Sequence, residues 1–154
     1  MKQIPKLAAT LLAALSLAAP LTPALAHDDA TLDTIKAPNG GQLRMAGTYH
    51  FELVVVKSSK EVKEHPVLVF VTDHAGAKIA TTGASGTATL LAGKLKANVT
   101  LAADGDNRMK GFAKYASTPD MKVVVAITLP GKQAEQARFT PMAAATDEHM
   151  NHKP

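Results

Sequence analysis

The chain has 154 residues, of which 17 are lysine or arginine and 13 are aspartate or glutamate, and its formal net charge is +4. It contains no cysteine, which excludes disulfide bonds, thiolate nucleophiles and cysteine-ligated metals. Any metal site must therefore use histidine, carboxylate, methionine sulfur or backbone groups. Because no basic run has aromatic residues interleaved with it, binding to nucleic acid is not expected.

The first 26 residues have the pattern of a secretory signal peptide. Lys2 and Lys6 form a positively charged start, and an apolar run over residues 7–19 follows them. This run is too short and too rich in alanine to form a stable transmembrane helix. We therefore expect cleavage after Ala26, localisation in the periplasm and a mature form with no membrane span.

The mature chain is expected to begin with a flexible arm, residues 27–38, which is polar and lacks periodicity. The sequence Asn39-Gly40-Gly41 then gives a turn signal. Residues 48–57, TYHFELVVVK, alternate between two faces, with Phe51 on the apolar face and His50 on the other. Alternation of this kind predicts a β-strand that is buried on one side.

Further short segments rich in β-branched residues are separated by turn signals as far as residue 141. The expected strands span 42–45, 48–57, 66–73, 77–80, 87–91, 95–101, 108–115, 122–129 and 133–139. Residues 39–141 are thus predicted to form an all-β domain, an antiparallel Greek-key β-sandwich of the immunoglobulin-like class with seven to nine short strands. The expected core consists of Phe51, Leu53, Val55, Val67, Val69, Val71, Leu90, Leu101, Val123, Val125, Ile127 and Phe139. Residues 142–154 lose the pattern and are expected to form a disordered tail that contains histidine and methionine.

The start of the mature chain offers one candidate metal site. Cleavage after Ala26 makes His27 the first residue, whose free amine and imidazole can chelate one ion together. Asp28 offers a carboxylate oxygen beside it. The alternative is that the residues after the cut form only a solvated, acidic start of the chain.

The tail offers a second candidate. His149 and His152 are three residues apart, and Met150 between them carries a soft thioether sulfur. Imidazole and thioether together suit copper in either oxidation state. The alternative is an unstructured polar tail with no site, because a short histidine-rich tract is only a compositional indication of metal binding.

Within the domain, Asp73 and His74 stand together in the turn sequence DHAG. They could bind a metal ion, but the Asp73 carboxylate could equally accept a backbone N–H of the turn. His50, on the polar face of its strand, and His65, in front of Pro66, are by default expected to be surface residues.

Residue patterns typical of catalysis are missing from the sequence. The mature serines, at positions 58, 59, 85 and 117, all lie in expected loops, and none belongs to a recognisable nucleophile motif. The sequence Asp104-Gly105-Asp106-Asn107 predicts a turn, since the later carboxylates of a calcium loop are missing. We therefore do not expect an enzyme.

The order of motifs resembles a group of small periplasmic β-sandwich proteins that accompany heavy-metal resistance and efflux systems. The motifs are APNGGQL, AGTYHFELVV, VLVFVTDHAG, ADGDNRMKG and MKVVVAITLPGKQAEQARF, which fall within residues 37–140. The pattern is similar to that of the extra N-terminal domain of some adaptor subunits of heavy-metal RND efflux pumps. Many such domains carry a histidine before the paired glycines, where this sequence has Asn39. A looser similarity, carried by His27 alone, is to periplasmic copper-resistance β-sandwiches that use an amino-terminal histidine as a copper ligand.

The resemblance and the histidines together predict a periplasmic accessory protein of a heavy-metal resistance or efflux system. It would bind a divalent or copper ion (Cu, Zn or Ni) through histidines, and its expected partner is a periplasmic adaptor or an RND efflux complex. Because only neutral histidines coordinate, the affinity should fall below about pH 6.5. The alternative is a metal-independent interaction module that docks on an envelope efflux complex through an exposed sheet edge or through the charged loop over residues 57–65.

Overall fold

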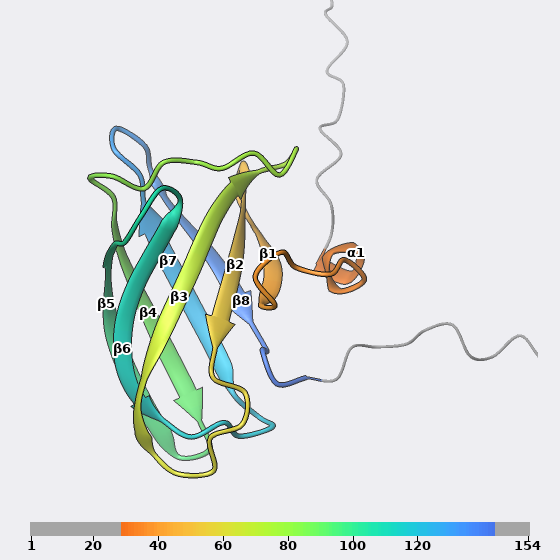
Figure 1. Ribbon diagram of the computed structural model, residues 1–154, viewed down its shortest axis with the longest axis vertical. Helices are drawn as coiled ribbons and strands as arrows, with labels where there is room; N and C mark the ends of the chain where they lie inside the picture. Colours follow the sequence, from red (N-terminus) through yellow and green to blue (C-terminus); the bar gives the residue numbers. More distant parts are fainter. Residues whose placement is uncertain (1–28, 144–154) are drawn as a thin grey trace, which may run out of the picture.

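A computed structural model describes residues 29–143 of the chain (Figure 1). The predictions for the signal peptide, for His27 and Asp28, and for the tail from residue 144 onward lie outside these residues. Among the helices that the structure describes, none has both the length and the apolar character that crossing a membrane requires.

The described residues fold into eight antiparallel strands and one short helix. In chain order these are α1 (Asp29–Asp33), β1 (Gln42–Ala46), β2 (Tyr49–Val55), β3 (Lys63–Asp73), β4 (Ser85–Ala92), β5 (Leu95–Ala103), β6 (Arg108–Tyr115), β7 (Lys122–Thr128) and β8 (Ala134–Phe139). The prediction of an all-β, antiparallel fold with seven to nine short strands is confirmed. The predicted strand over residues 77–80 does not form; an isolated bridge between Lys78 and Thr72 is found there instead.

The eight strands belong to one sheet in the order β1-β2-β3-β6-β5-β4-β7-β8. Because β1 and β8 also contact each other, the sheet curls until it almost closes on itself (Figure 1). The ladder between β5 and β6 is short and joins only Ala102 to Lys110 and Ala103 to Met109. The finer description as a Greek-key, immunoglobulin-like sandwich stays a prediction.

The core lies inside the curled sheet and follows the alternation of the strands. The register of β2 and β3 pairs Phe51 with Val71 and Leu53 with Val69, and all four side chains are buried. All twelve residues of the predicted core are buried, so this prediction is confirmed. The core also contains three large buried side chains that the prediction omitted: Met109, Tyr115 and Met121.

The segment before β1 corrects the expectation of an extended, flexible arm over residues 29–38. Helix α1 packs beside β1 (Figure 1), and its Leu32 is only 2% exposed. Arg44 of β1 donates from Nη1 to Asp33 Oδ1 at 2.6 Å and from Nη2 to Asp33 Oδ2 at 3.0 Å. A helix of five residues is not stable alone, so its contacts with β1 stabilise it. Contacts of this kind leave no periodic pattern in the sequence.

The two ends of the described chain lie at the same side of the fold. The backbone N–H of Thr140 donates to Gln42 Oε1 at 2.8 Å. Leu32, Ile35 and Ala143 line one small cavity of about 320 Å³. The segment that precedes β1 and the segment that follows β8 are therefore neighbours.

Candidate functional site

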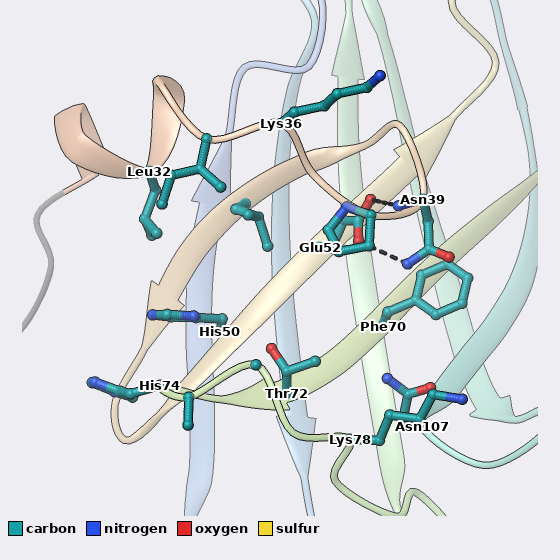
Figure 2. Close-up of a pocket in the computed structure, with 15 residues that line it drawn as sticks. Leu32, Lys36, Asn39, His50, Glu52, Phe70, Thr72, His74, Lys78 and Asn107 are labelled. Atoms are coloured by element: carbon teal, nitrogen blue, oxygen red, sulfur yellow. Dashed lines mark hydrogen bonds between the residues drawn. The ribbon is translucent and has the colours of Figure 1, made fainter.

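A cavity of about 570 Å³ lies between the N-terminal segment and the outer face of β2 and β3 (Figure 2). Its lining includes apolar side chains such as Leu32 and Phe70 as well as the polar His50 and Glu52. His50 and Glu52 alternate along β2 with core residues and so point away from the core. They are nevertheless only 8% and 3% exposed, because residues 32–39 cover this face of the sheet. The strand face expected to be at the surface is therefore the floor of a covered pocket.

The Glu52 carboxylate fastens the N-terminal segment to the sheet. Its Oε1 accepts the backbone N–H of Asn39 at 2.8 Å and that of Gly41 at 2.9 Å, and its Oε2 accepts Asn39 Nδ2–H at 2.8 Å (Figure 2). Three N–H donors compensate for the burial of this carboxylate. Glycine is needed at position 41, because a Cβ there would overlap the carbonyl oxygen of Leu53.

His50 and His74 form a stacked pair of imidazole rings at the other end of the pocket. Their ring centroids are 4.9 Å apart, and the ring planes differ by 18°. Figure 2 shows the two rings one above the other, on the far side of the pocket from Asn39. His50 comes from the middle strand of the β1–β2–β3 run, and His74 from the turn directly after β3. His50 is buried, whereas His74 is exposed, so solvent reaches the pair from the His74 side.

Asp73 shapes the turn that brings His74 to this position. Its Oδ1 accepts the backbone N–H of Ala75 at 2.9 Å and that of Ala77 at 2.8 Å. This is the turn-forming role that the sequence had left open beside metal binding. Among the two residues of the predicted Asp73–His74 pair, His74 is therefore the one that contacts another candidate ligand.

Of the other predicted metal ligands, His27, Asp28, His149, Met150 and His152 lie outside the described residues. Within residues 29–143, no group of three or more histidine, aspartate or glutamate side chains is arranged to hold a metal ion. Within the same residues, His50 and His74 are two histidines whose side chains lie in contact.

Sequence reasoning missed the partner of His74 and a third nearby residue. His50 is paired across the sheet with Thr72 of β3, and His74 follows Thr72 by two residues. On the other side, Met45 of β1 is paired directly with His50. The signal that could have found both residues is the register of β1, β2 and β3. Predicting that register requires the length of each turn between these strands, which decides which residues lie opposite each other.

A second histidine contact lies at the other end of β3. His65 Nε2 is 2.8 Å from Ser59 Oγ, and the ring of His65 lies 5.0 Å from that of Tyr115. The Ser59 hydroxyl donates its single hydrogen to the carbonyl oxygen of Glu61 at 2.8 Å. While Ser59 donates to that carbonyl, the contact with His65 has His65 as the donor, which is the reverse of the arrangement in which a histidine activates a serine nucleophile.

Comparison with known proteins gives no match to a family model, to a curated protein or to a solved structure.

Proposed function

We propose that this chain is a periplasmic accessory protein of a heavy-metal resistance or efflux system, and that it binds a divalent or copper ion through histidines. The observation that carries the proposal is the stack of His50 and His74 at one end of a covered pocket. The resemblance of the sequence motifs to periplasmic metal-resistance proteins supplies the biological setting.

The histidine pair has properties that suit a transition-metal ion. Imidazole nitrogen is a preferred ligand of Zn(II), Cu(II) and Ni(II). One imidazole stands on a strand and the other on a turn that Asp73 braces, so little backbone order has to be gained on binding. The two rings, which are nearly parallel in the stack, turn about their side-chain bonds so that a nitrogen of each points at the ion. Two protein ligands leave positions for water or for the predicted terminal ligands His27, His149 and His152. Such an open site suits an ion that is passed on to an adaptor or a pump.

The proposal is tested by titrating the mature protein with Zn(II), Ni(II) and Cu(II) by calorimetry. His50→Gln and His74→Gln should each weaken binding by roughly tenfold or more, which is about 1.4 kcal/mol. His65→Gln is the matched control, because His65 lies at the other end of β3, and it should leave the affinity within about twofold. The titration is repeated with His27, His149 and His152 replaced by asparagine, so that ligands at the termini do not hide the effect.

Unchanged affinity in both His50→Gln and His74→Gln would rule out this site. Metal tolerance of cells that carry the same variants tests the biological part. Intact tolerance, together with metal-independent co-purification of an envelope efflux complex, would support the interaction module instead.

A further inference from the structure

Met45 lies where its thioether can join the histidine pair. The register of β1 and β2 pairs Met45 directly with His50. Residues directly opposite each other on antiparallel strands point to the same face, with Cβ atoms about 4.5–5.5 Å apart. Met45 is only partly buried, and methionine has three rotatable bonds with which to direct its sulfur.

Met45 and His74 thus flank His50 from two sides. Met45 comes from β1, His50 from β2, and His74 from the turn after β3. The stacked rings already bring His74 against His50. Two imidazole side chains and one thioether side chain, from β1, β2 and the turn after β3, therefore lie close together at one edge of the pocket.

The carboxylates around this group are occupied by N–H donors. Glu52 accepts from Asn39 and Gly41, and Asp73 Oδ1 accepts from the turn backbone. Asp29 Oδ1 accepts the backbone N–H of Met45 at 3.3 Å, and its Oδ2 lies 3.7 Å from Arg44 Nε. Among the described residues, the donors that set this group apart are therefore its imidazole nitrogens and its thioether sulfur.

We infer that Met45, His50 and His74 form a soft site that takes copper(I). This inference rests on the proposed function and names the ion that the histidine pair prefers. A thioether adds affinity for copper(I), whereas Zn(II) and Ni(II) gain little from it. The ion is bound in the copper(I) state in which it arrives, so binding requires no electron transfer.

The test measures copper(I) and Zn(II) affinities of the mature protein, the former without oxygen against a chromophoric copper(I) chelator. Met45→Leu keeps the size and apolar character of the side chain but removes the sulfur. The matched control is Met142→Leu, because Met142 is also partly buried but lies beyond β8. Every protein in the series carries replacements of the predicted terminal ligands: His27, His149, Met150 and His152.

Met45→Leu should weaken copper(I) binding by roughly tenfold or more while Zn(II) affinity stays within about twofold. The sulfur contribution to the X-ray absorption spectrum of the copper(I) complex should disappear in Met45→Leu and persist in Met142→Leu. Thermal unfolding of both variants without metal checks that each is folded.

If Met45→Leu keeps both its copper(I) affinity and the sulfur signal, the soft site is wrong. The proposed function would still stand in that case, provided that His50→Gln and His74→Gln weaken Zn(II) binding. If those two variants bind Zn(II) as tightly as the parent protein, the histidine site itself fails and the soft site fails with it.

Discussion

Glu52 is a buried carboxylate whose hydrogen bonds fasten the N-terminal segment across the pocket. Glu52→Ala would leave the backbone N–H groups of Asn39 and Gly41 without their acceptor. Asn39 is exposed and Gly41 is partly buried, so water can replace part of the lost interaction. We therefore expect the free energy of unfolding to fall by about 1 kcal/mol. Urea denaturation followed by circular dichroism measures it.

Glu52→Gln is the matched variant, because it keeps the shape and one oxygen. That oxygen can still accept from the two backbone N–H groups, and the side-chain amide of Asn39 can turn to face the new NH₂ group. The loss should therefore be smaller than in Glu52→Ala. Equal losses in the two variants would show that these hydrogen bonds do not hold the segment.

At the scale of elements, helix α1 depends on its ion pair with β1. The hydrogen bond from Arg44 holds the pKa of Asp33 below its ordinary value of 3.8, and partial burial opposes this effect. Because the folded-state pKa is lowered, the stabilisation is complete above the ordinary pKa. It is lost as the pH falls through the lower pKa of the folded state.

Asp33→Asn should therefore lower the free energy of unfolding at neutral pH by about 1 kcal/mol, since the pair is partly exposed. It should also reduce the loss of stability below about pH 4. Trypsin cleavage after Lys36 should become faster, because α1 leaves β1 more often. Glu61→Gln, which breaks the exposed pair of Glu61 and Lys63, is the control and should change none of these three quantities.

Strands could be predicted because each carries its own periodicity, and α1 could not. Alternation over residues 48–57 located β2 and also assigned Phe51 to the core. Helix α1 has five residues, and the partner that holds it, Arg44, stands 11 residues after Asp33. A contact of that kind leaves no pattern within the helix sequence itself.

Only part of the candidate site could be predicted from the sequence, for a related reason. Asp73 and His74 are adjacent, so the turn was noticed, and its hydrogen bonds follow the known preference of aspartate. His50 was placed on the correct face of its strand, but it was expected at the surface. Its burial and its contact with His74 depend on strand register and on the segment that covers the face, and both are tertiary features.

At the scale of the whole molecule, β5 and β6 share the shortest ladder of the sheet, because only two residue pairs join them. Gly111 of β6 lies against β5, and a Cβ there would overlap the side chain of Val99 and the carbonyl oxygen of Thr100. Gly111→Ala should therefore push the strands apart and lower the free energy of unfolding by about 1–3 kcal/mol. Chemical denaturation measures the loss.

Gly86→Ala is the control for this prediction. A Cβ at Gly86 would meet its nearest neighbours at 3.2 Å, which requires only a small adjustment. Its effect should be clearly smaller than that of Gly111→Ala. Similar losses at the two positions would mean that close packing of β5 on β6 does not limit the stability of the sheet.

The neighbouring ends of the described chain give the two terminal segments a common anchor. Leu32 and Ala143 line the same small cavity, and Thr140 is hydrogen-bonded to Gln42. Two segments that are joined to one fold at adjacent points encounter each other intramolecularly. For short linkers, the effective concentration of one segment around the other is roughly millimolar. In the sequence, the candidate ligand His27 precedes this anchor, and His149 and His152 follow it. An ion held by one segment would therefore meet the other far more often than it would meet a second molecule of the protein.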